Sequence, residues 1–122
     1  MTGVQTCALP IYNHLLTEDA PPSKSYAYIS DTKYLPELAE KLKGIDLLYH
    51  EATFLNDKLE RAQETYHTTA LQAGVMASKS EVKRLIIGHF SARYKNLYPL
   101  LEEARLEFEN STLAIEGDIF KV

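Results

Sequence analysis

The chain has 122 residues, with 13 lysines and arginines against 17 aspartates and glutamates, a formal net charge of -4 and 45% hydrophobic residues. At this length a folded chain buries roughly two-thirds of the surface that its unfolded form exposes, which is enough for one core but not for two. The negative charge argues against a protein that coats nucleic acid through a general basic field. No apolar run approaches the ~20 residues of a membrane-spanning helix, and the first residues lack a secretory signal pattern. The composition predicts one small soluble domain, expected in the cytoplasm.

Residues 1–11 (MTGVQTCALPI) have no helical or strand periodicity and no charged side chain, and they contain Cys7, the one cysteine of the chain. A lone cysteine cannot form an internal disulfide. The segment resembles the in-frame translation of a common short-read sequencing adapter. We therefore expect it to be non-native and unpacked, and we exclude it from the fold prediction. Residues 12–122 are then expected to be the C-terminal part of a longer domain whose N-terminal half is missing.

Short apolar segments with the composition of β-strands follow a polar entry that contains Pro21-Pro22. Three of them are residues 25–30, 45–49 and 83–88. The second is apolar almost throughout, as expected of a strand buried on both faces. Near the end, residues 112–115 and 118–122 flank Glu116-Gly117, a pattern typical of a two-residue hairpin.

Helical periodicity fills the intervals between these strands. A first apolar face is followed by Gly44, which favours a helix end. A second helix is predicted over about residues 68–79, and its stripe of small residues allows a close approach to a sheet or another helix. The apolar faces are Leu35, Leu38, Ala39 and Leu42 for the first helix, Ala70, Ala73, Gly74 and Ala77 for the second, and Leu97, Leu100, Leu101, Ala104 and Phe108 for a third. Strands alternating with helices predict an α/β layered domain.

Chemically reactive side chains stand directly after the predicted strands. In α/β sheets, functional residues gather just beyond the carboxyl ends of the strands, where loops leave the rigid scaffold. One strand leads into Asp31, the next into His50-Glu51, and the third into Gly88-His89, while His67 precedes the second helix. A carboxylate pair and two histidines at one sheet edge predict a metal or acid/base site formed by Asp31, Glu51, His67 and His89.

These residues also have structural alternatives. Asp31 could cap the helix that follows it. Thr68 or Thr69 could cap the second helix, which would leave His67 an ordinary surface histidine. His89 could be a partly buried histidine whose ring is satisfied by the backbone. We expect His50 to pack structurally, His14 to have no role, and the glutamates of the third helix to form a solvated face: Glu102, Glu103, Glu107 and Glu109.

Four segments together carry a family resemblance: AYISDTKY, LLYHEATF, ETYHTTALQA and LIIGHFSARY. In this order they resemble successive motifs of ribonuclease Z, the tRNA 3′-processing endoribonuclease of the metallo-β-lactamase superfamily. The resemblance extends from about Ser25 to the end of the chain. It implies the C-terminal half of a metallo-β-lactamase (αββα) fold, an α/β domain with a mixed sheet and flanking helices.

The resemblance also implies a role for each candidate residue. Asp31 resembles a carboxylate that bridges two zinc ions, and His89 resembles the last histidine ligand of one of them. Glu51 and His67 resemble the acid/base couple, in which the carboxylate orients the imidazole and the imidazole protonates the departing 3′ oxygen. Ser91 and Arg93 resemble residues that grip the acceptor-stem backbone, and the planar guanidinium suits phosphate oxygens.

One departure from the family pattern limits these expectations. The metal motif H-x-H-x-D-H occurs nowhere in the 122 residues. We therefore expect about half of a two-zinc site, and no cleavage of precursor tRNA by the chain alone. The family is typically homodimeric, and we expect the same of the complete protein.

Three rival functions differ in class. The same acid/base couple would serve a phosphodiesterase that acts on small phosphodiesters. Asp31 could instead be the phosphoacceptor of a flavodoxin-like signalling domain, although the late strand then lacks the expected lysine and ends in Gly88-His89. A non-catalytic α/β binding module is the third possibility.

Overall fold

The computed structural model describes residues 16–122, so the expectation for residues 1–11 lies outside the described residues. Within these residues, four strands form one parallel sheet in the order β1-β2-β3-β4: β1 (Tyr26–Ile29), β2 (Leu47–Glu51), β3 (Arg84–Gly88) and β4 (Ser111–Leu113). The three predicted strands thus lie where their composition placed them. Because the strands run parallel, their carboxyl ends meet at one edge of the sheet.

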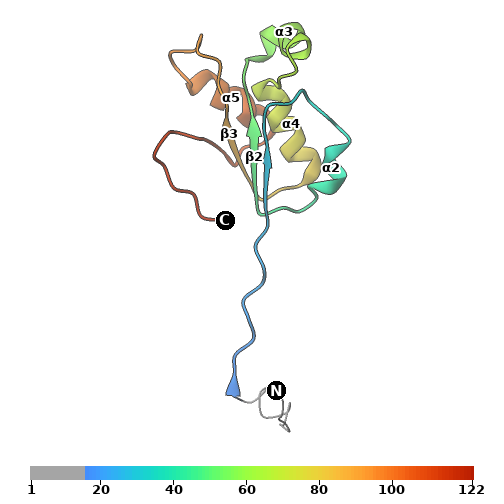
Figure 1. Ribbon diagram of the computed structural model, residues 1–122, viewed down its shortest axis with the longest axis vertical. Helices are drawn as coiled ribbons and strands as arrows, with labels where there is room; N and C mark the ends of the chain where they lie inside the picture. Colours follow the sequence, from blue (N-terminus) through green and yellow to red (C-terminus); the bar gives the residue numbers. More distant parts are fainter. Residues whose placement is uncertain (1–15) are drawn as a thin grey trace.

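Helices connect the strands (Figure 1). Between β1 and β2 lies α2 (Leu38–Lys41); between β2 and β3 lie a 3-10 turn η1 (Asn56–Lys58), α3 (Leu59–Glu64) and α4 (Ala70–Ser80); α5 (Tyr98–Glu107) precedes β4. Gly44 has a φ of 73° just after α2, where the sequence predicted a helix end. The sequence did not predict α3, whose residues are polar except Leu59 and Ala62. The α/β class with flanking helices is confirmed.

The core lies between the sheet and α4 and α5. Alternate strand residues such as Leu48, Leu85 and Ile87 face it, and the small residues of α4 let both the sheet and α5 approach closely. At Gly74, an added Cβ would lie 2.5 Å from the carbonyl oxygen of Ala104 in α5. The predicted stripe of small residues is therefore the contact surface between two helices.

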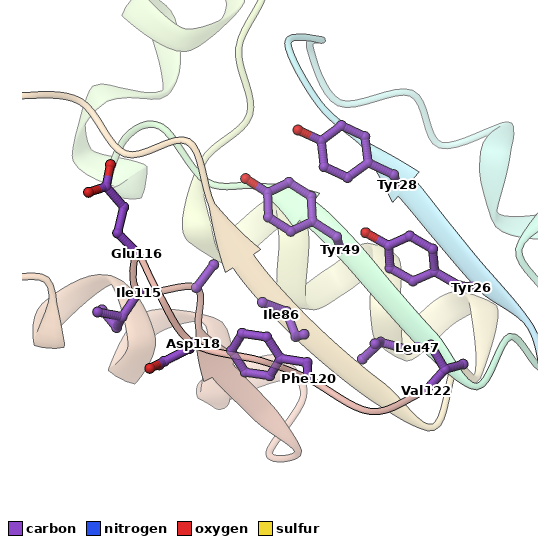
Figure 2. A pocket seen from close by; sticks show the side chains of 11 residues that line it. Tyr26, Tyr28, Leu47, Tyr49, Ile86, Ile115, Glu116, Asp118, Phe120 and Val122 are labelled. Atoms are coloured by element: carbon purple, nitrogen blue, oxygen red, sulfur yellow. The ribbon is translucent and has the colours of Figure 1, made fainter.

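The opposite face of the sheet is apolar and partly open (Figure 2). A groove of about 530 Å³ lies between this face and the C-terminal segment; its lining includes Tyr26, Tyr28, Leu47, Tyr49, Ile86 and Phe120. The rings of Tyr28 and Tyr49 stack with centroids 4.5 Å apart. Burial raises the pKa of Tyr49 to about 12.

The predicted C-terminal hairpin is wrong. A turn does form at Gly117, with a φ of 90°, and the amide of Asp118 donates to the carbonyl of Ile115 over 3.0 Å. Beyond it, residues 118–122 pair with no strand, so the described sheet is parallel throughout rather than mixed. Phe120 and Val122 instead line the groove over the apolar sheet face, which removes them from the sheet edge (Figure 2).

The described segment before β1 projects away from the domain (Figure 1) and forms no strand. Within residues 16–122, no helix is long and apolar enough to span a membrane.

Candidate functional site

The candidate residues lie at the carboxyl edge of the sheet. Glu51 is the last residue of β2 and pairs with Gly88 in β3, so His89 follows directly beside it. Asp31 stands two residues beyond β1, and His67 stands two residues before Thr69, the N-cap of α4. Parallel pairing thus places loops from three strands and the start of a helix around one point.

Glu51, His67 and His89 come together there. Each offers one ligand atom within 4.8 Å of the other two. Nδ1 of His67 lies 3.2 Å from Oε1 of Glu51, Nδ1 of His89 lies 3.9 Å from the same oxygen, and the two imidazole rings have centroids 5.3 Å apart. The Glu51 side chain is fully buried, whereas that of His89 is 41% exposed. The cluster therefore joins a buried carboxylate to solvent-accessible imidazoles.

Both carboxylate oxygens of Glu51 already accept hydrogen bonds. Oε1 accepts from the amide of Thr32 over 2.7 Å and contacts Nδ1 of His67. Oε2 accepts from the hydroxyl of Thr53 and from the amide of Thr68, each over 2.7 Å. Four donors satisfy a carboxylate fully, which is the usual condition for a buried charge. Glu51 is thus placed to anchor the site and to orient His67.

Asp31 lies at the margin of this cluster. Its side chain is 79% exposed, and its Oδ1 lies 3.9 Å from Nδ1 of His67. It does not cap α2, because that helix has Glu37 at its N-cap position and no side-chain cap. The helix-capping alternative for Asp31 is therefore wrong.

The structural alternatives for the other residues have mixed outcomes. Thr69 does cap α4 in a capping box with Gln72, as one alternative predicted. His67 is nevertheless no ordinary surface histidine, because its side chain is only 21% exposed and contacts Glu51. His50 is buried, and its Nδ1 lies 2.9 Å from the carbonyl of Glu51, so its predicted structural role is confirmed. Burial lowers the pKa of His50.

Backbone strain concentrates at the site. Four non-glycine residues of the described chain have positive φ: Asp31 (54°), Tyr66 (60°), Glu81 (52°) and His89 (60°). Three of these residues belong to the site: Asp31 and His89 are candidate residues, and Tyr66 directly precedes His67. Left-handed backbone in a non-glycine residue costs free energy and persists where the surroundings enforce it, most often at functional sites.

The loop after His89 carries Ser91 and Arg93. The amide of Ser91 donates to the carbonyl of Thr53 over 3.0 Å, which ties this loop to the end of β2. Nε of Arg93 donates to Oγ of Ser91 over 3.3 Å, and its guanidinium lies 5.2 Å from the ring centroid of Phe54. Stacking and one hydrogen bond hold a cation in an exposed position beside the cluster.

Two residues of this region were missed in the sequence. Thr53 lies within the segment LLYHEATF, but no periodicity marks its hydroxyl as a link between Glu51 and His89. Glu103 was assigned to a solvated face, and that prediction is wrong. Its carboxylate accepts from the amides of Asn56 and Leu71, at 2.9 and 3.0 Å, and thus caps the first turn of α4. Burial raises the pKa of Glu103.

The donor chemistry fits part of a metal site. Zinc takes neutral imidazole and carboxylate ligands. Because Nδ1 of His89 contacts Thr53, its Nε2 is the ring nitrogen left for a metal, and the exposed carboxylate of Asp31 is a second donor. Glu51 is less suited, because its oxygens are satisfied by protein donors. Structural and catalytic zinc sites use three or four protein ligands, so these two donors amount to part of a site.

The chain is similar to curated relatives that are named ribonuclease Z, and no family model matches it. It is 55% identical over 107 residues to ribonuclease Z of Bacteroides thetaiotaomicron, covering 88% of this chain and 34% of that protein. It is 48% identical over 103 residues to ribonuclease Z of Porphyromonas gingivalis, covering 84% and 34%. The chain thus spans about a third of the length of the curated relatives it matches.

Solved structures agree on the fold. The metallo-β-lactamase fold protein YhfI from Bacillus subtilis superposes with a TM-score of 0.74 at 23% identity, over 81% of this chain and 40% of that one. Human tRNase Z, short form, gives a TM-score of 0.54 at 29% identity, over 68% of this chain and 27% of that one. The chain is therefore a homologue of ribonuclease Z over about a third of that protein's length, and it has part of the metallo-β-lactamase fold.

Proposed function

We propose that this chain supplies the acid/base residues and part of the metal site of an endoribonuclease that removes the 3′ trailer of precursor tRNA. The observation that carries the proposal is the group formed by Glu51, His67 and His89, whose ligand atoms lie within 4.8 Å of one another. The identity of 55% with a ribonuclease Z supports the choice of substrate.

In this proposal, His67 donates a proton to the departing 3′ oxygen and Glu51 orients His67. The contact of 3.2 Å between Nδ1 of His67 and Oε1 of Glu51 orients the ring. Water attacks the phosphorus and releases one proton to the solvent, the bond from phosphorus to the 3′ oxygen breaks, and Nε2 of the His67 imidazolium donates its proton to that oxygen. His67 then takes up a proton from the solvent, which completes the cycle. The products are a tRNA with a 3′ hydroxyl and a trailer with a 5′ phosphate. Glu51 touches no substrate and acts through His67.

Asp31 and His89 would hold the metal in the complete protein. Their donor types suit zinc, and we propose two zinc ions there, with the remaining ligands supplied by residues outside this chain. When bound, such ions lower the pKa of water so that a nucleophile exists at neutral pH. The position of both residues beyond parallel strands supports this assignment.

Ser91 and Arg93 would contact the phosphates of the acceptor stem. The support is the exposed guanidinium of Arg93, held over Phe54 on the loop that carries His89. A planar fork can bind two phosphate oxygens at once. We further propose that the complete protein is a cytoplasmic homodimer, as expected from the family resemblance.

A chimera tests the function. The matched residues of this chain replace the corresponding segment of Bacteroides thetaiotaomicron ribonuclease Z, which is 55% identical over that region. We expect the chimera to cleave precursor tRNA and leave a 3′ hydroxyl, and the 122-residue chain alone to show no cleavage.

Other outcomes separate the rivals. A chimera that folds, binds metal and hydrolyses only a small chromogenic phosphodiester supports the small-substrate phosphodiesterase. A folded chimera with neither activity supports the non-catalytic module. Labelling of Asp31 by a small phosphodonor would support the signalling domain.

A further inference from the structure

Thr53 lies between the residues to which the proposed function gives separate tasks. It follows β2 by two residues and is only 6% exposed. Its Oγ1 lies 2.7 Å from Oε2 of Glu51, 3.1 Å from Nδ1 of His89 and 2.9 Å from the carbonyl oxygen of His89. One hydroxyl therefore contacts both the buried carboxylate and the imidazole proposed to bind metal.

The protons of this network can be assigned. A threonine hydroxyl has one proton to donate and lone pairs to accept with. Oε2 of Glu51 is the nearest of its three neighbours and is an acceptor in a charge-assisted bond, so it receives that proton. The contact between Oγ1 of Thr53 and Nδ1 of His89 then requires the proton on Nδ1. Oε1 of Glu51, 3.9 Å from Nδ1, also favours a proton there.

The backbone holds Thr53 in place independently of its side chain. Its amide donates to the carbonyl of Thr68 over 2.9 Å, and its carbonyl accepts from the amide of Ser91 over 3.0 Å. These bonds join β2 to the segment that carries His67 and to the loop that carries His89. A side-chain substitution at Thr53 therefore leaves the main-chain geometry of the site supported.

We propose that Thr53 is a positioning residue that fixes His89 in the tautomer with the proton on Nδ1, and so presents the Nε2 lone pair to a metal ion. The inference rests on the proposed function only for its second part, the metal. Histidine ligands commonly donate their other ring N–H to an oxygen that fixes tautomer and ring orientation. Here that oxygen belongs to a hydroxyl, which is itself oriented by Glu51.

The first test needs no metal and no substrate. Long-range ¹⁵N–¹H correlation spectra of the metal-free 122-residue chain at pH 8 report which ring nitrogen of each histidine is protonated. We expect the Nδ1–H form for His89 in the parent chain and in Thr53→Ser. In Thr53→Val, which removes the hydroxyl at nearly constant shape, we expect the population to move toward the Nε2–H form that free histidine prefers.

His50 provides the internal control. Its Nδ1 contacts the carbonyl of Glu51 at 2.9 Å, so its own Nδ1–H form should persist in every variant that folds. An Nε2–H form of His89 in the parent chain overturns the proposal without any variant. An unchanged tautomer in Thr53→Val, with the His50 signals intact, overturns it as well. If Thr53→Val fails to fold, the parent spectrum still decides.

The second test concerns the metal and uses the chimera. We expect Thr53→Val to weaken the affinity for Zn²⁺ by roughly 10- to 100-fold, the usual effect of losing such a partner, and Thr53→Ser to retain it. Equal affinities overturn the metal part of the inference. The two proposals fail separately: a chimera with no cleavage of precursor tRNA contradicts the function, whereas an unshifted His89 tautomer contradicts the role of Thr53.

Discussion

Asp31 and His89 are two residues that the proposed site needs. Both have left-handed backbone, with φ values of 54° and 60°. Glu81 has the same geometry, at 52°, but lies at the C-cap of α4. A strained backbone conformation that the function requires is retained although it lowers the free energy of unfolding. Glu81 has the same strain but no proposed role in the site, so comparing glycine variants of Asp31 and Glu81 separates the effect of strain on stability from the effect on function.

We expect both Asp31→Gly and Glu81→Gly to stabilise the chain, by up to about 1 kcal/mol each, because glycine adopts positive φ without steric strain. Glu81 also pairs with Lys43 at 3.3 Å, but exposed ion pairs contribute little. Urea unfolding of the 122-residue chain measures the change. In the chimera, only Asp31→Gly should abolish cleavage. A strongly destabilised Asp31→Gly chain, or cleavage lost in Glu81→Gly, contradicts this account.

His50 makes stability depend on pH. Its pKa is lowered by burial, so the folded chain resists protonation at this residue. Below the unfolded pKa of about 6.5, the unfolded chain takes up a proton that the folded chain does not, and stability decreases. This contribution is therefore present above pH 6.5 and is lost as the pH falls toward the lower folded value.

We expect the carbon-bound ring protons of His50 to keep constant NMR shifts from pH 7.5 to 5.5, and the free energy of unfolding to decrease over that range. Titration of the His50 signals near pH 6.5 would contradict the assignment of a buried neutral ring.

For individual residues, the sequence was informative where reactive side chains directly follow a strand. Glu51, His67 and His89 were expected together and lie within one cluster. Thr53 and Glu103 were not, because their roles depend on long-range contacts with backbone amides and ring nitrogens that no periodicity encodes. A carboxylate on the polar face of one helix cannot be recognised in the sequence as the hydrogen-bond acceptor for backbone amides of another helix.

Helices α4 and α5 show what one small residue controls. A methyl group at Gly74 would lie 2.5 Å from the carbonyl of Ala104 and 3.1 Å from Cβ of Glu107. The first neighbour is backbone and cannot rotate away. The helices would have to separate, which overpacks and distorts the interface.

We therefore expect Gly74→Ala to destabilise the chain by about 1 to 2 kcal/mol, although alanine has the higher helix propensity. Ser78→Ala is the matched control, because Ser78 lies exposed in the same helix. That variant should remain within about 0.5 kcal/mol of the parent. Urea unfolding measures both. A stabilised Gly74→Ala chain would show that the two helices are not in close contact.

Elements with strong periodicity were predictable, and weakly patterned ones were not. The faces of α4 and α5 and the apolar runs of β2 and β3 came directly from the sequence. The polar helix α3 gave no signal, since only Ala62 is buried in it. The C-terminal residues were predicted to form a hairpin because two short segments flank Glu116-Gly117. Phe120 and Val122 line the groove over the sheet face instead.

The whole molecule has two unequal faces. One face of the sheet is covered by α4 and α5, and the other holds Tyr26, Tyr28 and Tyr49 beside a groove of about 530 Å³ (Figure 2). The candidate site lies at the edge between these faces. The family resemblance gave the partial nature of the fold, which agrees with a match to about a third of the relatives. Composition and periodicity predicted the α/β class and several of its elements, but they did not indicate the metallo-β-lactamase fold.

The roles of His67 and Asp31 are tested most directly by zinc stoichiometry and single-turnover cleavage of precursor tRNA, measured on the same chimera variants. His67→Ala should slow cleavage by roughly two to four orders of magnitude, as expected for a lost general acid, and should retain the zinc content of the parent chimera. Asp31→Ala should lose zinc and turnover together. Loss of zinc in His67→Ala, or full zinc content in Asp31→Ala, would contradict the account, because the roles of proton donor and metal ligand would then be assigned to the wrong residues.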